Sequence, residues 1–234
     1  MNVLFIPLNK KETRLGFVIA GIYLLTSFFL EATGNQLLQL LLLLPMFAAV
    51  AIVGRRFFKE TFTCLPLTGK QLIWKPLLAV LGHRAVCFLV HDLFLLLEFP
   101  YFTASDWGPV LWDIRVYLLE THTSAHQWLT AVCLVILAPI VEEFLFRGVI
   151  LGTLYPKRSA LAVIFSVALF AALHTLPYVT HAFSAMGSDA ALYLCLYAFS
   201  YIPMGLFLTW LYISTDSIFA PMIMHMIINY GLVF

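Results

Sequence analysis

Residues 138–155 read APIVEEFLFRGVILGTLY and place Glu142, Glu143 and Arg147 inside an otherwise apolar run. Together with the apolar residues before it, the run extends over 126–154, and about 20 residues suffice for a helix to cross the hydrocarbon core of a bilayer. A charged side chain at the centre of such a helix costs about 2.5–3.5 kcal/mol. These three side chains must therefore pair with one another or face a polar cavity, which marks the run as a candidate functional site.

The composition agrees with a membrane protein. Of the 234 residues, 62% are hydrophobic and 11% are charged, whereas soluble domains carry about 25% charged residues. We expect an all-α, polytopic helical bundle that forms one integral membrane domain over residues 1–234 and contacts membrane lipids. The net charge of +1, without a basic stripe, argues against a nucleic-acid partner.

Seven hydrophobic stretches predict about seven transmembrane helices. They cover 15–31, 36–54, 72–97, 126–154, 159–176, 190–213 and 217–234. The third stretch contains His83, Arg84, His91 and Asp92, so it is either one long helix with a polar face or a broken pair, which would give eight spans. These polar side chains have two interpretations. In one they bind a substrate carboxylate; in the other they pair with one another and only stabilise the fold.

Basic residues in short loops predict the orientation, because such residues collect on the cytoplasmic side. Three clusters fall on one side of a seven-span protein: Lys10, Lys11 and Arg14; Arg55, Arg56 and Lys59; Lys157 and Arg158. The acidic, aromatic loop 98–125 falls on the other side, where it forms an interfacial helix or a lid. We expect an inside N-terminus in the cytoplasmic membrane of a prokaryote.

Helix geometry separates the roles of the two glutamates. Each residue advances about 100° around an α-helix, so Glu143 and Arg147 share a face and can pair. Glu142 points about 100° away from that face and is free for another partner. We interpret Glu143–Arg147 as an internal brace and Glu142 as the reactive carboxylate; the alternative is that both glutamates only hold helices together.

Two further apolar stretches carry imidazoles. FAALH ends at His174, and HMIIN places His225 and Asn229 on one helical face. A lone histidine in a membrane helix usually packs, but a carboxylate with an imidazole can activate water, and a second imidazole with an amide can stabilise an oxyanion. Zinc held by Glu142, His174 and His225 is the alternative. We expect no metal cofactor, because the Asn229 amide suits an oxyanion better than a cation.

The three motifs together resemble one family. Residues 142–147 (EExxxR), 170–174 (FxxxH) and 225–229 (HxxxN) occur in the order typical of the CAAX prenyl endopeptidase and bacteriocin-processing (CPBP) family of glutamate-dependent intramembrane proteases. The resemblance covers 126–234, which would be the catalytic core, with a cavity opening inside the membrane. It implies that Glu142 and His174 activate water and that His225 and Asn229 bind the oxyanion. Glu143, Arg147 and Phe170 would support them.

The resulting prediction is an endopeptidase acting on a membrane-embedded or lipid-anchored peptide or protein, such as a C-terminal tail or sorting signal. A proton-coupled transporter is one alternative, although it predicts repeats or interrupted helices in matching halves, which the sequence lacks. A non-catalytic membrane scaffold is the other.

Overall fold

The computed structural model describes residues 7–33, 36–63, 71–96, 131–156, 159–176, 179, 183–184, 187 and 190–233. All regular elements in these ranges are helical, which confirms the predicted all-α class. In chain order they are α1 (Lys10–Thr33), α2 (Gln36–Val53), α3 (Arg55–Thr63), α5 (Gln71–Leu96), η1 (Cys133–Leu137), α8 (Ala138–Glu143), η2 (Phe144–Leu151), α9 (Gly152–Leu154), α10 (Ser159–Thr175), α12 (Ala190–Thr215) and α13 (Phe219–Val233).

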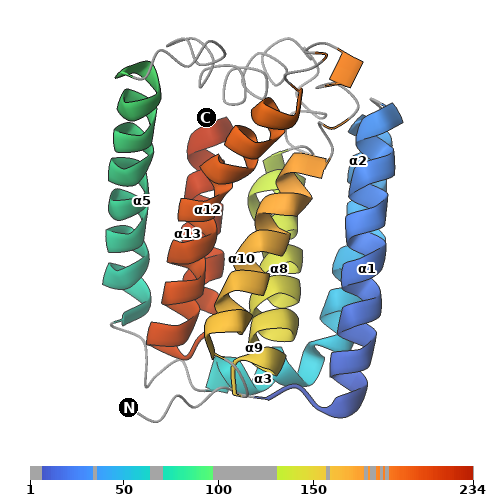
Figure 1. The fold of residues 1–234 in the computed structure, drawn as a ribbon. Helices are drawn as coiled ribbons and strands as arrows, with labels where there is room; N and C mark the ends of the chain where they lie inside the picture. Colours follow the sequence, from blue (N-terminus) through green and yellow to red (C-terminus); the bar gives the residue numbers. More distant parts are fainter. Residues whose placement is uncertain are drawn as a thin grey trace.

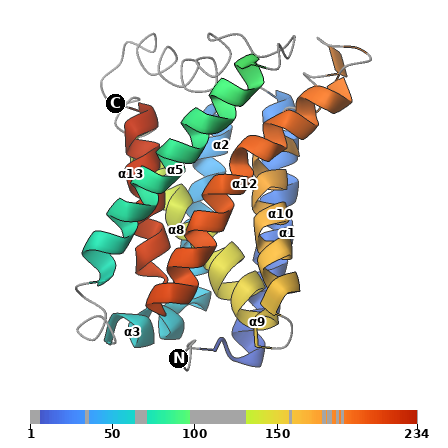
Figure 2. The same ribbon diagram turned by 60° about the vertical axis from the view of Figure 1, so that its left-hand side comes forward.

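The glutamate-bearing segment forms the centre of the bundle. Elements η1, α8, η2 and α9 follow one another as a single helical pass, and this pass lies inside the bundle in both views (Figures 1 and 2). Helices α1, α2, α10 and α13 all contact it. Residues 141–151 are consequently buried without interruption, so the charges of this pass can be neutralised only by protein groups or enclosed water.

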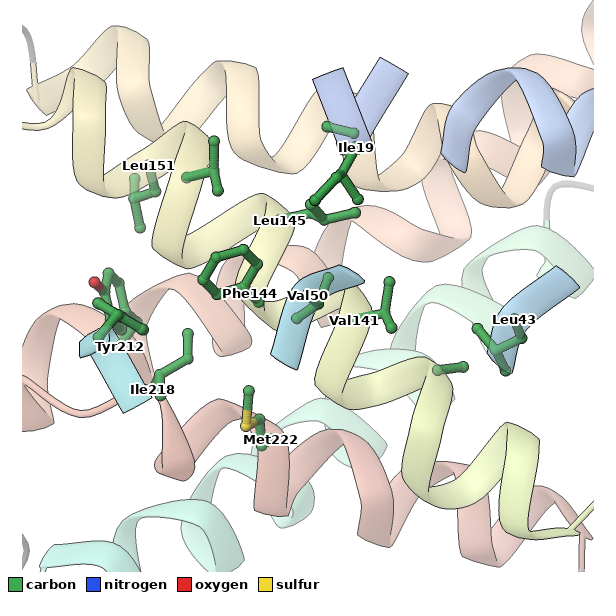
Figure 3. Close-up of a cluster of buried hydrophobic side chains, with 14 of the residues drawn as sticks. Ile19, Leu43, Val50, Val141, Phe144, Leu145, Leu151, Tyr212, Ile218 and Met222 are labelled. Atoms are coloured by element: carbon green, nitrogen blue, oxygen red, sulfur yellow. The ribbon is translucent and has the colours of Figure 1, made fainter. Parts of the chain in front are cut away.

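Large apolar side chains fix the central pass in place. Val141, Phe144, Leu145 and Leu151 pack against residues of α1, α2, α12 and α13 (Figure 3). The ring of Phe144 lies 5.9 Å from that of Phe57 on α3, in an edge-on arrangement. This packing determines which way Glu142 and Glu143 point from their helix.

Pi-helical turns replace ordinary α-helical turns on both sides of the glutamates, in η1 and η2. The sequence predicted an α-helix throughout 126–154, so this is a local departure. Pro139 at the start of α8 accounts for part of it, because proline has no N–H to donate to a carbonyl in the preceding turn. Such turns are frequent at functional sites.

The third hydrophobic stretch forms one continuous helix, α5, with Pro76 inside it. The single-helix alternative is therefore the one observed, and the broken pair is not. The side chains of His91 and Asp92, the residues 157–158 and the acidic loop 98–125 lie outside the part that the structure describes.

Residues 55–63, expected as part of a short loop, instead form the amphipathic helix α3. Its axis bends by 64° from that of α2, and Phe57 and Thr61 are its buried residues. Arg56 bonds both Glu12 at the start of α1, at 2.6 Å, and Glu60, at 2.7 Å. This polar contact ties α3 to the beginning of α1.

Among the described residues, one helix segment, Gln71–Leu89, is long and apolar enough to cross a membrane. A second candidate exists if the bent pair Leu41–Val53 and Arg55–Thr63 counts as one span. Many large apolar side chains face outward, among them Leu81 of α5 and Ile164 of α10, which suits contact with lipid. The count of seven or eight transmembrane helices stays a prediction.

Candidate active site

Glu143 accepts hydrogen bonds from two helices. Arg147 lies 3.2 Å from its Oε1, as the helical spacing predicted, and both side chains are fully buried. The Nδ1–H of His225 on α13 donates to the same oxygen at 2.8 Å. Glu143 thus orients the His225 ring so that its other nitrogen, Nε2, points away toward Glu142. A carboxylate behind an imidazole in this way fixes both its orientation and its tautomer.

The Arg147 side chain contacts residues of three elements, α8, α10 and α12. Its guanidinium also donates to the Gly205 carbonyl of α12 at 3.2 Å and lies 4.7 Å from the centre of the Phe170 ring of α10. A Cβ on Gly205 would come within 3.1 Å of a Val167 methyl carbon, so glycine lets α12 approach α10 closely enough for these contacts. An ion pair, a carbonyl and an aromatic face compensate the buried positive charge, while Arg147 Nε makes no hydrogen bond within the described part of the chain.

Glu142 faces a different set of partners. Its Oε1 accepts a hydrogen bond from the Tyr23 hydroxyl of α1 at 2.9 Å. Its Oε2 lies 3.8 Å from Nε2 of His174 and 3.8 Å from Nε2 of His225, and this buried oxygen makes no hydrogen bond within the described part of the chain. Both separations are too long for a direct hydrogen bond but short enough for one water molecule to bond to all three atoms.

The tautomer of His174 follows from its backbone contact. Its Nδ1 lies 2.9 Å from the Phe170 carbonyl oxygen, and since a carbonyl only accepts, Nδ1 carries the hydrogen. In the neutral ring Nε2 is then an acceptor facing Glu142. Tyr201 stacks on the ring at 4.4 Å and Phe170 contacts it at 4.5 Å. The His174 side chain keeps 23% of its surface exposed against 2% for His225.

Asn229 lies one turn beyond His225 on α13, and one of its two amide hydrogens is engaged in a hydrogen bond. Nδ2 donates to the Leu134 carbonyl of η1 at 2.9 Å. The preceding helix bond in η1 runs from Ala138 to Cys133, five residues back, so the next one would run from Pro139 to Leu134. Pro139 has no hydrogen to donate, and Asn229 supplies the missing donor. The Asn229 amide retains a second N–H for another acceptor.

Sequence reasoning missed Tyr23 and Tyr201. The sequence of the first 125 residues predicts only generic hydrophobic spans, yet Tyr23 contacts Glu142 directly. Membrane tyrosines collect at the two water boundaries, whereas Tyr23 lies near the middle of the predicted span 15–31. That depth is the signal that could have identified it.

The spacing of the site bears on the zinc alternative. Two ligand atoms bound to one tetrahedral zinc lie about 3.4 Å apart, given bond lengths of about 2.0–2.2 Å, which is less than the 3.8 Å observed here. No trio of His, Cys, Asp or Glu side chains within the described ranges has the spacing of a metal site. Absence of a metal cofactor nevertheless stays a prediction, and an experiment for it is given below.

An apolar groove of about 570 Å³ opens between α10 and α12. Val167, Ala171 and Thr175 line it from α10, and Ala198 and Ile202 line it from α12. None of the predicted catalytic or supporting residues lines this groove, so it is distinct from the cluster of Glu142 and the two imidazoles.

Comparison with known families identifies the relatives of this arrangement. Residues 124–231 match the family described as type II CAAX prenyl endopeptidase Rce1-like. Over this segment, somewhat less than half of the chain, the protein is similar to the Rce1-like family. All seven predicted site residues lie within the matched segment, whereas Tyr23 lies outside it. Neither the search of curated proteins nor that of solved structures gave a match.

The match agrees with the resemblance that the three motifs indicated. Rce1-like proteins are integral membrane endopeptidases that act on membrane-associated peptides. The segment that carries the predicted site residues is therefore similar to membrane proteases of this family.

Proposed function

We propose that the protein is a glutamic-type intramembrane endopeptidase in which Glu142 and His174 activate a water molecule. The observation that carries this proposal is the position of Glu142 Oε2, 3.8 Å from Nε2 of both His174 and His225 and without a hydrogen bond of its own in the described part of the chain. Its substrate is a membrane-embedded or lipid-anchored peptide or protein, cut near a C-terminal tail, a sorting signal or a lipid anchor.

The reaction follows from the hydrogen-bond directions. Water bound between Glu142 Oε2 and His174 Nε2 transfers a proton to the carboxylate as its oxygen forms a bond with the peptide carbonyl carbon. The resulting oxyanion accepts hydrogen bonds from His225 Nε2–H and from the second N–H of Asn229. The carbon–nitrogen bond then breaks, and Glu142 returns the proton to the departing amine.

The supporting residues have complementary tasks in this proposal. Glu143 accepts from His225 Nδ1 and so holds the ring with Nε2 toward the site, and the oxyanion role of Nε2 requires a ring that carries a proton on each nitrogen. Arg147 balances the charge of Glu143 and fixes it through α12 and Phe170.

The decisive variant is Glu142→Gln, which keeps the size of the side chain and removes the base. Glu60→Gln on α3 is the matched control, because Glu60 bonds Arg56 outside the site. Membranes from cells producing wild type, Glu142→Gln or Glu60→Gln should be compared by mass spectrometry for newly formed peptide ends. We expect wild-type and control membranes to share cleavage products that are at least about 10³-fold reduced in Glu142→Gln.

Several outcomes distinguish the alternatives. Identical products from wild type and Glu142→Gln, in equal amounts, would exclude the catalytic role and leave a scaffold. Pumping of protons into proteoliposomes that depends on Glu142, without any cleavage, would favour the transporter. Loss of cleavage with a zinc chelator and recovery with added zinc would establish the metal-dependent mechanism; unchanged cleavage supports the metal-free one.

A further inference from the structure

Tyr23 brings α1 into contact with the proposed base. Its hydroxyl donates to Oε1 of Glu142 at 2.9 Å. Glu142 is 6% exposed, so its carboxylate has little contact with bulk solvent and Tyr23 is the donor that Oε1 has. The contact joins residues 119 positions apart and reaches the family-matched segment from outside it.

A close contact between α1 and the central pass explains why Tyr23 lies beside Glu142. Gly16 faces Val149 so closely that a Cβ on Gly16 would lie 2.5 Å from a Val149 methyl carbon. Seven residues later on α1, Tyr23 meets Glu142, which lies seven residues before Val149; the two helices therefore run antiparallel with matched steps. Ile19, buried between the two contacts, lies beside the central pass in Figure 3. The small Gly16 allows the close approach that places the hydroxyl.

The hydrogen bond from Tyr23 gives the two oxygens of the Glu142 carboxylate different roles. Oε1 is held by Tyr23, whereas Oε2 points between the two imidazoles. A carboxylate that lost the phenolic donor would have a buried oxygen without a partner and would gain by turning toward an imidazole N–H. A hydrogen bond to one oxygen also stabilises the ionised form that accepts the proton from water.

We propose that Tyr23 is a positioning residue of the endopeptidase reaction: its hydroxyl holds one oxygen of Glu142 and thereby aims the other at the water between His174 and His225. The inference rests on the proposed function, since it assigns Glu142 as the base. It makes α1 a necessary part of the active site, although the family match begins at residue 124.

The test variant is Tyr23→Phe, which keeps the ring and removes only the hydroxyl. Thr26→Val is its matched control on the same helix, because the Thr26 hydroxyl bonds the Ile22 and Tyr23 carbonyls of α1 and not the site. Steady-state cleavage should be measured in proteoliposomes with a substrate identified in the membrane comparison. We expect kcat of Tyr23→Phe to fall about 10–100-fold, as for other groups that orient a catalytic ligand or base, with KM changed less than about twofold.

A second readout does not depend on turnover. The infrared difference spectrum between a protein and its Glu142→Gln derivative isolates the carboxylate bands of Glu142. The same difference spectrum is then recorded with Tyr23→Phe present in both wild type and the Glu142→Gln variant. The Glu142 bands should shift, because one carboxylate oxygen loses its donor. Thr26→Val, introduced in the same way, should not shift them. A larger residue at Gly16, as in Gly16→Leu, should lower kcat and shift the same bands, since it displaces α1.

The outcomes separate the two proposals. If Glu142→Gln abolishes cleavage but Tyr23→Phe keeps wild-type kcat and unshifted carboxylate bands, Tyr23 is only a packing residue and the inference is wrong. If Glu142→Gln leaves cleavage intact, the proposed function fails, and a band shift in Tyr23→Phe would then report a structural contact alone.

Discussion

Replacing Arg147 by methionine tests the charge balance at the centre of the bundle. Arg147 and Glu143 are both completely buried, and their ion pair is 3.2 Å long. Removing one partner of such a pair costs about 3–5 kcal/mol, because the other charge remains buried and uncompensated. At about 2–4 °C per kcal/mol for a chain of this size, Arg147→Met should lower the melting temperature by about 6–20 °C.

The assay is thermal unfolding of the purified protein in one detergent, with two companion variants. The double variant Glu143→Gln/Arg147→Met removes both charges together and should recover at least half of the loss, since paired apolar or neutral replacements are tolerated. Arg55→Met, on the exposed side of α3, is the matched control. It should move the melting temperature by no more than about 2 °C, as exposed charges contribute about 0–1 kcal/mol.

Two results would refute this reasoning. Arg147→Met and Arg55→Met could melt at the same temperature, which would mean that the Glu143 charge does not need Arg147. Alternatively, the double variant could be as unstable as the sum of the two single variants, which would mean that the two side chains are not coupled.

Three further expectations concern the packing and the edge of the site. Gly205→Ala should lower the free energy of unfolding by about 1–3 kcal/mol through overpacking, because its new Cβ would lie 3.1 Å from a methyl carbon of α10. Gly21→Ala, with nothing within 4 Å, should raise it by up to about 1 kcal/mol through helix propensity. Equal melting temperatures of the two variants would contradict this. Asn229→Leu should lower stability by about 1–3 kcal/mol, since a carbonyl of η1 loses its donor, and an unchanged melting temperature would show that the amide serves the reaction alone. Burial alone would raise the pKa of Glu12, but hydrogen bonds from Arg56 and from a backbone N–H outweigh it and lower that pKa below its ordinary 4.5. The stabilisation is then present above pH 4.5 and lost on acidification through the folded pKa. Glu12→Gln should therefore melt below wild type at neutral pH, and the difference should shrink as the pH falls through the folded pKa; a gap independent of pH would contradict this.

The chemical composition of the site could be predicted from local patterns. Glu143 and Arg147 are four residues apart, and a helix brings such residues together whatever surrounds it. The order of the three motifs indicated which segments supply the carboxylate and the imidazoles, and the family match covers those segments. The glutamate pair is the partner that the sequence predicts for the imidazoles, but which glutamate bonds His225 depends on how α13 is rotated against the central pass.

Asn229 shows the limit of reasoning from a shared helix face. Its spacing from His225 placed both on one side of α13, but one amide hydrogen bonds the Leu134 carbonyl. That partner became accessible through two features together: the missing N–H of Pro139 and the π-helical register of η1. A proline can be recognised in a sequence, whereas the carbonyl that it leaves free depends on the register of the turn.

The amino-acid sequence alone determined the all-helical class, the buried ionisable residues and the pairing of Glu143 with Arg147, because periodicity and the cost of burying charge act within a single helix. Only the tertiary structure decided that Tyr23 meets Glu142 and that two imidazoles face the same oxygen. Those contacts depend on the depth and rotation of one helix against another. Close approaches such as Gly16 to Val149 and Gly205 to Val167 set them, and their effect appears only when the helices pack.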